Sequence, residues 1–109
     1  MSAKLEVRIA DFSRFPYGRY PKHGPFNGER FRQEWLMPAF RSEGTVSVDL
    51  SGARGLSPSF LEEAFGGLVR EGLRPETILA RLEVRGERDS SIVERIQRYV
   101  REAGFRAAH

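Results

Sequence analysis

The sequence predicts one α/β domain spanning residues 1–109, with a mostly parallel sheet whose helices lie chiefly on one face. Strand-like and helix-like hydrophobic periods alternate along the chain in the order β-α-β-α-β-α. Strands separated by helices normally pair in parallel through right-handed crossovers. All three predicted strands carry polar residues at alternate positions, whereas strands covered on both faces are usually apolar throughout. One sheet face is therefore expected to be open to solvent, to a chain extension or to a partner, including a second copy in a homodimer.

The first predicted strand places Leu5, Val7 and Ile9 at alternate positions. The segment 11–27 follows it and is long for a connection, so we expect a functional or packed loop. Its five aromatic residues favour packing over disorder.

A helix is predicted after this loop, starting near Asn27 or Gly28 and kinked or shortened at Pro38, which lacks a backbone donor. Its apolar stripe consists of Phe31, Trp35, Leu36, Ala39 and Phe40. The second predicted strand then alternates Val46, Val48 and Leu50 with polar residues.

A serine-bearing turn leads from this strand into the next helix. Ser57 fits the N-cap and Pro58 the first helical position, where the missing N–H costs nothing. Ser59 then lies beside unpaired backbone N–H groups at the positive end of the helix dipole, where a phosphate would be stabilised. The apolar stripe of this helix is Leu61, Ala64, Phe65 and Leu68.

The last predicted elements are a strand and a helix. Gly72 and Pro75 act as stop signals, and residues 78–84 alternate as a third strand. Ser91 fits the N-cap of the final helix, with Glu94 completing a capping box.

The helix after the serine turn carries a polar face with few side chains. At 100° per residue this face comprises Ser59, Glu62, Glu63, Gly66, Gly67 and Arg70. Two adjacent glycines cost about 1 kcal/mol each against alanine inside a helix. They predict a bare surface on which a partner chain can lie, unless the helix breaks at Gly66 or a glycine permits close packing within the domain.

Basic residues are expected to gather with Ser59 at the carboxyl edge of the sheet, the usual ligand edge of open α/β folds. They are Arg14, Arg19, Lys22, Arg54, Arg85 and Arg88. A hydroxyl at a helix start beneath arginines suits a phosphate. The alternative is that these charges are solvated and that Ser57 and Ser59 merely start the helix.

Composition limits the function classes. The formal charge of +3, from 18 basic and 15 acidic residues, permits anionic partners without demanding them. The chain has no cysteine, and His23 and His109 are far apart in sequence, so we expect no metal and no cofactor. No apolar run approaches the roughly 20 residues that span a bilayer, and we expect a cytoplasmic protein.

The segment from Val48 to Leu68, together with Phe15-Pro-Tyr-Gly-Arg19 and Gly28-Glu-Arg-Phe-Arg32, resembles a bacterial STAS-like domain family of unknown function. That family is similar to the anti-sigma factor antagonists. The resemblance covers about residues 5–86.

In the antagonists, a histidine-kinase-like ATPase phosphorylates a hydroxyl in the corresponding turn. The resemblance implies Ser59 as the phosphoacceptor, with Ser57 in the place of the family's aspartate and as the second candidate hydroxyl. Phe60 and Glu62 replace small residues that normally follow the acceptor. Glu62 and Glu63 would repel a phosphate on Ser59, which Arg54 and the helix start could offset.

We therefore expect a non-enzymatic signalling module that docks a regulatory protein through Arg54, Ser59 and the Glu62–Arg70 helix face. The alternative is an anion-binding domain, in which the loop 11–27 holds a nucleotide or nucleic acid through Arg14, Arg19 and Lys22 with aromatic stacking. An enzyme using Asp49, Glu62 or Glu63 is not expected, because no nucleophile, base and orienting group stand at the required spacing.

Overall fold

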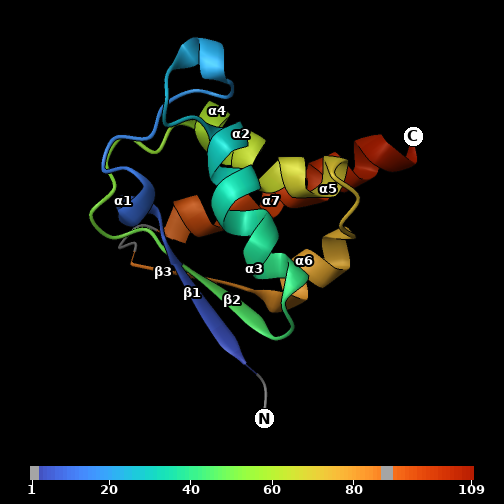
Figure 1. Ribbon diagram of the computed structural model, residues 1–109. Helices are drawn as coiled ribbons and strands as arrows, with labels where there is room; N and C mark the ends of the chain where they lie inside the picture. The colour runs from blue at the N-terminus through green and yellow to red at the C-terminus, as the bar shows by residue number, and fades with distance from the viewer. Residues whose placement is uncertain (1–2, 87–89) are drawn as a thin grey trace.

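A three-stranded parallel sheet forms one layer of the domain, and the computed structural model describes residues 3–86 and 90–109. The strands are β1 (Lys4–Arg8), β2 (Thr45–Asp49) and β3 (Leu82–Arg85), and β2 lies between the other two. Both pairings are parallel, which confirms the predicted α/β class (Figure 1).

Two helical runs and a long C-terminal helix form the second layer (Figure 1). The first run is α2 (Gly28–Phe31), the π-helical turn η2 (Arg32–Leu36) and α3 (Met37–Arg41). The second is α4 (Pro58–Leu61), the π-helical turn η3 (Glu62–Gly66) and α5 (Gly67–Arg70). The remaining helices are α1 (Ile9–Phe12), the 3-10 turn η1 (Pro21–His23), α6 (Pro75–Arg81) and α7 (Ser90–Ala108). Pro38 does not end the first run; a π-helical turn before it accommodates its missing donor.

The register of the sheet separates an apolar face from a charged face. Val7, Val48 and Val84 lie side by side across the three strands. Glu6, Ser47 and Glu83 form the next row, with side chains on the opposite face. In the described part of the chain the helices cover the apolar face and leave the charged face bare, as predicted (Figure 1).

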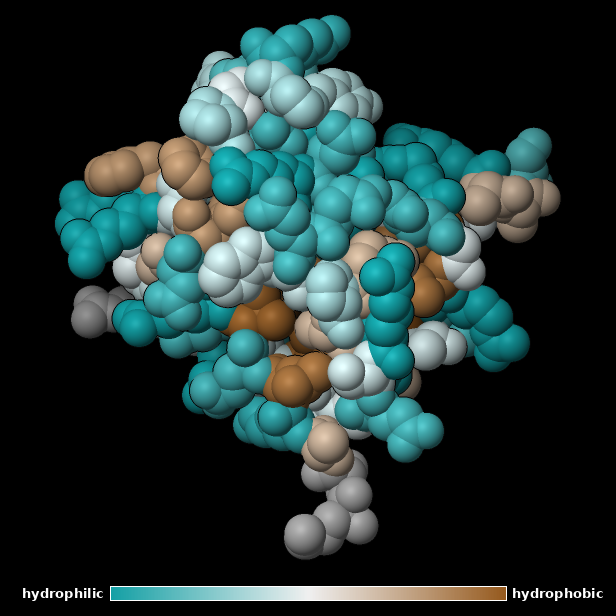
Figure 2. Space-filling view, in the orientation of Figure 1, coloured by the Kyte–Doolittle hydropathy of each residue, from teal (hydrophilic) through white to brown (hydrophobic). Residues whose placement is uncertain are grey.

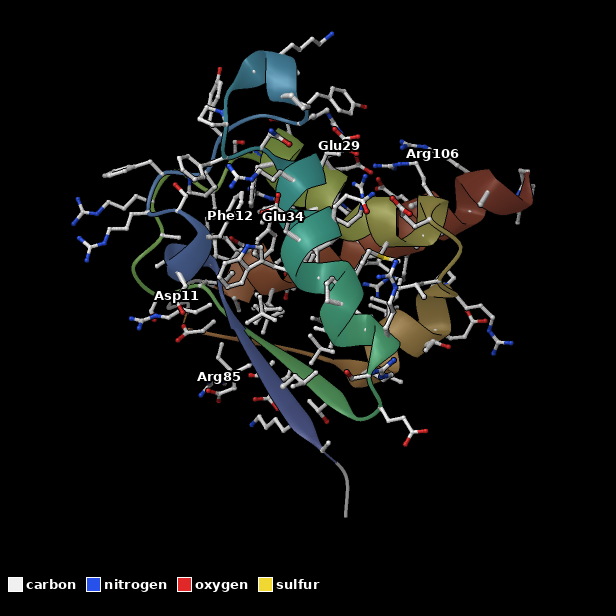
Figure 3. All side chains as sticks on the ribbon, in the orientation of Figure 1. Asp11, Phe12, Glu29, Glu34, Arg85 and Arg106 are labelled. Carbon is white, nitrogen blue, oxygen red and sulfur yellow. The ribbon has the colours of Figure 1, made fainter. Side chains whose placement is uncertain are left out.

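The core lies between the apolar face and the helices. Its largest fully buried side chains are Phe31, Phe60, Phe65, Ile9, Leu36, Leu61, Leu68, Ile78 and Ile96. Phe12 joins α1 to this core, with its ring 5.3 Å from that of Phe31 (Figure 3). Because the helix α7 packs on η3 and α5, the second helical run is held between α7 and α2.

The third strand is shorter than predicted. Residues 75–81 form α6 with Pro75 at its first position, and only residues 82–85 pair with β2. The spacing of Ile78 and Leu82 suits a helix face as well as a strand, and packing decides between them. Arg81 is the last residue of α6, and its side chain donates to the carbonyls of Phe40 and Gly44, which anchors this end of the helix. The final helix begins at Ser90, one residue before the predicted N-cap Ser91.

Candidate functional site

The serine turn has the predicted geometry. The Ser57 hydroxyl accepts a hydrogen bond from the Phe60 N–H at 3.2 Å, which confirms Ser57 as the N-cap, and Pro58 is at the first helical position. Ser59 is half-buried, with its Oγ 3.3 Å from the Ser57 Oγ. It lines a cavity of about 270 Å³ together with Tyr17, Gly18, Arg19 and His23. The candidate phosphoacceptor therefore lies beneath the long loop.

The loop 11–27 is packed and anchored. Its backbone pairs Tyr17 N with Phe26 O, and Gly18 O accepts from Gly28 N, both at 2.9 Å. Inside the loop, the His23 Nδ1 accepts from the backbone N–H groups of Arg19 and Tyr20. The bonds from Gly28 and Glu29 to the carbonyls of Gly18 and Arg19 fix the loop against the start of α2.

Aromatic side chains of this loop are exposed. Among the described residues six large hydrophobic side chains are exposed, and four of them belong to this loop: Phe15, Tyr17, Tyr20 and Phe26. Phe15 is 69% and Tyr17 65% exposed. Figure 2 shows pale and brown surface gathered over this loop at the upper left, above a mostly teal body. We call these four residues the aromatic patch.

An ion-pair cluster is built on Glu62 and Glu63, in the helical turn that follows Ser59. The Glu62 carboxylate accepts from Arg19 at 2.5 Å and from Arg70 at 2.9 Å. Glu63 is 4% exposed, and its carboxylate pairs with the buried Arg32 at 2.8 Å. Arg19 comes from the loop, Arg32 from η2 and the two glutamates from η3, so the cluster ties three segments together.

The cluster shifts the ionisation of its members. Burial acts to raise the pKa of Glu62, but the hydrogen bonds from Arg70 and Arg19 outweigh it, and the pKa lies below its ordinary value. The same hydrogen bond to Glu62 raises the pKa of Arg19, although burial opposes it. Both groups are therefore held in their charged forms.

The predicted bare docking face is wrong for its central residues. Glu63, Gly66 and Gly67 are buried. The runs α2 and η2 lie against η3 and bring Arg32 onto Glu63 and Gly67, and the side chains of Glu62 and Arg70 cover Gly66. A Cβ on Gly67 would stand 2.0 Å from the Arg32 Nη1, and a Cβ on Gly28 would stand 2.7 Å from the Phe60 carbonyl oxygen. Gly67 and Gly28 thus permit close packing between the two helical runs, whereas a Cβ on Gly66 would meet only the side-chain ends of Glu62 and Arg70. Close packing by a glycine is the alternative that the sequence left open.

The outer members of that face keep some exposure. Arg70 and Arg54 are exposed, and Ser59 and Glu62 are half-buried. Arg32 and Gly28 were not identified from the sequence as the residues that cover this helix face. Both belong to the Gly28-Glu-Arg-Phe-Arg32 motif. A glycine on each of two helices can indicate that the helices cross closely, and this signal was available in the sequence.

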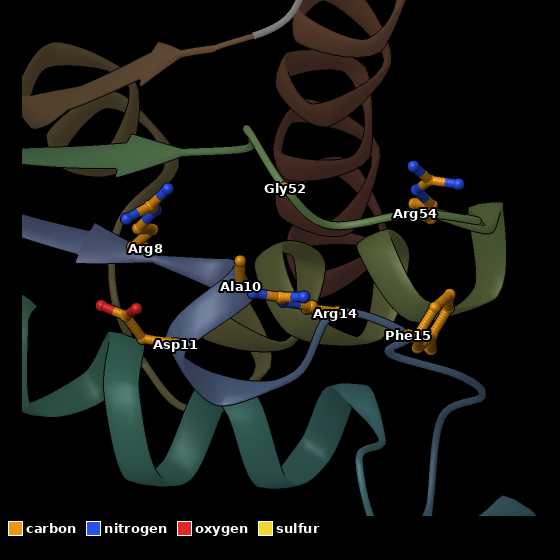
Figure 4. A pocket seen from close by; sticks show the side chains of 7 residues that line it. All are labelled: Arg8, Ala10, Asp11, Arg14, Phe15, Gly52 and Arg54. Carbon is orange, nitrogen blue, oxygen red and sulfur yellow. The ribbon is translucent and has the colours of Figure 1, made fainter.

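The predicted basic edge is only partly assembled. Arg14 and Arg54 share a cavity of about 430 Å³ with Arg8 (Figure 4). Arg19 instead pairs with Glu62, and Lys22 lies over the Tyr20 ring at 6.0 Å. Arg19 and Lys22 are therefore engaged elsewhere and do not line this cavity.

Arg85 also departs from the predicted edge. It lies on the bare sheet face, where it pairs with Glu6 at 2.9 Å and donates to the Ser47 Oγ at 2.9 Å (Figure 3). Side-chain alternation along β3 sends it to that face rather than over the edge. Arg88 lies outside the described residues.

Asp49 stabilises the turn after β2. Its Oδ1 accepts from the Ser51 hydroxyl at 2.7 Å and from the Ser51 N–H at 2.9 Å, and these bonds lower the pKa of Asp49. Across residues 3–86 and 90–109, no three His, Cys, Asp or Glu side chains are grouped to hold a metal ion. Helices within the same ranges lack either the length or the apolar character needed to cross a bilayer.

The fold and this edge define the class of protein: a small parallel α/β domain with one covered sheet face and a serine-capped helix at the carboxyl end of its central strand. The family model of the STAS-like domain of unknown function (DUF4325) matches residues 27–91, more than half of the chain. The chain belongs to this family, and the resemblance drawn from the sequence is confirmed. Neither a search of curated proteins nor one of solved structures found a match.

Proposed function

We propose that this domain is a non-enzymatic signalling module that docks a regulatory protein through the aromatic patch and the adjoining Ser57–Ser59 turn. The observation that carries the proposal is the exposure of four aromatic side chains on an anchored loop that also covers Ser59. Exposed apolar patches of this kind mark interaction sites, and aromatic residues dominate the energy of interfaces. A preordered loop also reduces the entropy lost on binding.

The proposed docking surface is therefore the loop 11–27, and not the Glu62–Arg70 helix face that the sequence predicted. Glu63 and Gly67 hold Arg32 within the fold, and Ser59 remains at the border of the new surface. A phosphate on Ser59 would meet Arg19 favourably and Glu62 unfavourably, and it would add charge beneath Tyr17. Phosphorylation by a histidine-kinase-like ATPase would thereby control docking.

The three carboxylates that were considered for an enzyme, Asp49, Glu62 and Glu63, make structural contacts. Asp49 holds its turn, and Glu62 and Glu63 hold the ion-pair cluster. A homodimer through the bare sheet face stays a prediction; Lys4–Glu83 and Arg85–Glu6 ion pairs already satisfy charges on that face.

The test is capture of a partner from an extract of the native cells by the immobilised domain. Tyr17→Ala should lose the partner, whereas Phe105→Ala, which removes a ring of similar exposure (66%) from α7, should retain it. Ser59→Glu should weaken capture and Ser59→Ala should not. Equal capture by Tyr17→Ala and Phe105→Ala would refute the docking surface, and a Ser59 that is never phosphorylated in protein purified from native cells would refute the switch.

A further inference from the structure

The cavity at the carboxyl ends of β1 and β2 holds cations without matching anions. Arg8, Ala10, Asp11, Arg14, Phe15, Gly52 and Arg54 line its volume of about 430 Å³ (Figure 4). Three arginines and a single carboxylate thus line the cavity. Cavities of this size accommodate small-molecule ligands, and this edge is where open parallel sheets bind them.

Two of these arginines are free to bind. Within residues 3–86 and 90–109, the side chains of Arg14 and Arg54 make no hydrogen bond or ion pair, and Arg8 reaches Asp49 only at 4.0 Å. Most other arginines of the fold are engaged: Arg19, Arg32 and Arg70 by glutamates, and Arg81 by carbonyls. Uncompensated guanidinium groups in one hollow favour an anion, above all a phosphoryl group.

The two arginines are held together by the backbone. The Arg54 N–H donates to the Arg14 carbonyl at 2.8 Å, which joins the loop after α1 to the loop after β2. Both side chains therefore start from neighbouring positions on one wall of the cavity. Phe15 follows Arg14 directly, lines the same cavity and exposes 69% of its surface. A planar ring bound next to the phosphoryl group could stack on it.

We propose that this cavity binds a mononucleotide, with its phosphates on Arg14 and Arg54 and its base against Phe15. The site is separate from the Ser59 cavity. It shares Phe15 with the aromatic patch, but its arginines do not enter the docking argument, so each proposal can fail without the other. Phosphates supply the charge that the arginines lack, and the ring distinguishes a nucleotide from a bare polyphosphate. Arg14 and Arg54 offer two guanidinium groups for two phosphates, so a nucleoside diphosphate is the probe of choice.

Isothermal titration of the whole chain with ADP tests the site, at concentrations up to about 1 mM, the upper range of metabolite affinities. Arg14→Ala and Arg54→Ala should each weaken ADP binding about tenfold or more, since a charge-assisted hydrogen bond contributes that much. Arg41→Ala is the matched control. It removes an exposed arginine at the end of α3, which leads into the opposite edge of the sheet, and should leave binding unchanged.

Phe15→Ala should weaken ADP binding several-fold without affecting pyrophosphate, which should bind more weakly than ADP in the wild-type chain. Thermal unfolding without ligand checks that each variant is folded. The proposal is overturned by the absence of ADP binding, by binding that Arg14→Ala and Arg54→Ala leave unchanged, or by pyrophosphate binding as tightly as ADP. Binding of single-stranded oligonucleotides in the absence of ADP binding would overturn it as well.

Discussion

The guanidinium of Arg32 lies directly over the backbone of Gly67, where a side chain would stand 2.0 Å from Nη1 and 2.7 Å from Cζ. The same nitrogen donates to the Glu63 carbonyl at 2.5 Å and its carboxylate at 2.8 Å. The glycine is thus part of the ion-pair cluster, because it leaves room for the buried Arg32, which holds the π-helical turn.

Gly67→Ala should lower the free energy of unfolding by about 2 kcal/mol or more. The methyl group displaces Arg32, and this outweighs the gain of roughly 1 kcal/mol in helix propensity. Gly66→Ala is the matched control: its Cβ meets the flexible end of Glu62 at 2.4 Å, so the cost should be smaller. Urea unfolding measures both, and an equal loss for the two variants contradicts the assignment.

Arg32→Met should destabilise the domain by about 3 kcal/mol, because it leaves the Glu63 carboxylate buried with weaker partners. The double variant Arg32→Met/Glu63→Met should recover much of that loss, since two apolar side chains fill the space without a buried charge. A double-mutant cycle measured by urea unfolding tests the coupling. Additive losses would show that the two side chains do not act as a pair.

The stability should depend on pH through Glu62. Its folded pKa lies below the ordinary 4.5, so the unfolded chain binds more protons, and stability rises with pH in this range. The contribution is complete above about pH 6 and is lost as pH falls through the folded pKa. Glu62→Gln should therefore be less stable than wild type by about 1 to 2 kcal/mol near neutrality, with the gap closing in acid.

Urea unfolding between neutral and acidic pH measures this difference. Asp49, whose pKa is also lowered, contributes in the same direction in both proteins. Glu62→Gln should therefore be less sensitive to acid than wild type, because Glu62 no longer titrates, and should keep the sensitivity that Asp49 supplies. A gap between the two curves that stays constant with pH would rule out the role of Glu62.

Ser57→Ala and Ser59→Ala should separate a structural serine from a functional one. Removing the Ser57 hydroxyl leaves the Phe60 N–H without its cap and should cost about 1 kcal/mol. Ser59→Ala should stay within about 0.5 kcal/mol of wild type, because the hydroxyl caps no backbone group in the described structure. Thermal unfolding compares them, and a larger loss for Ser59→Ala would reverse the assignment.

Much of the fold followed from local patterns. The alternation at Val46 and Val48 and the signals at Ser57 and Pro58 depend on neighbouring residues only, and the structure bears them out. The strand predicted over residues 78–84 was right for residues 82–84 and wrong for residues 78–81, whose pattern also fits the helix α6 (Pro75–Arg81).

The candidate site was harder to predict, because its contacts join distant segments. Helical spacing put Glu63, Gly66 and Gly67 on one face of the helix, but no local signal shows that α2 and η2 cover that face. Likewise, Arg14 and Arg19 stand in one loop, yet a nearby carboxylate engages Arg19 alone.

The sequence by itself determined the parallel α/β class, the bare sheet face and the capped helix start, since periodicity and capping are properties of adjacent residues. The tertiary structure decided which polar groups neutralise one another and which remain free. Arg32 fills the space over Gly67, Arg19 closes the loop on Glu62, and a backbone hydrogen bond brings Arg14 and Arg54 to the same cavity. Ion pairs and close contacts depend on distances of a few ångströms between segments far apart in the chain, and only the packing of those segments sets them.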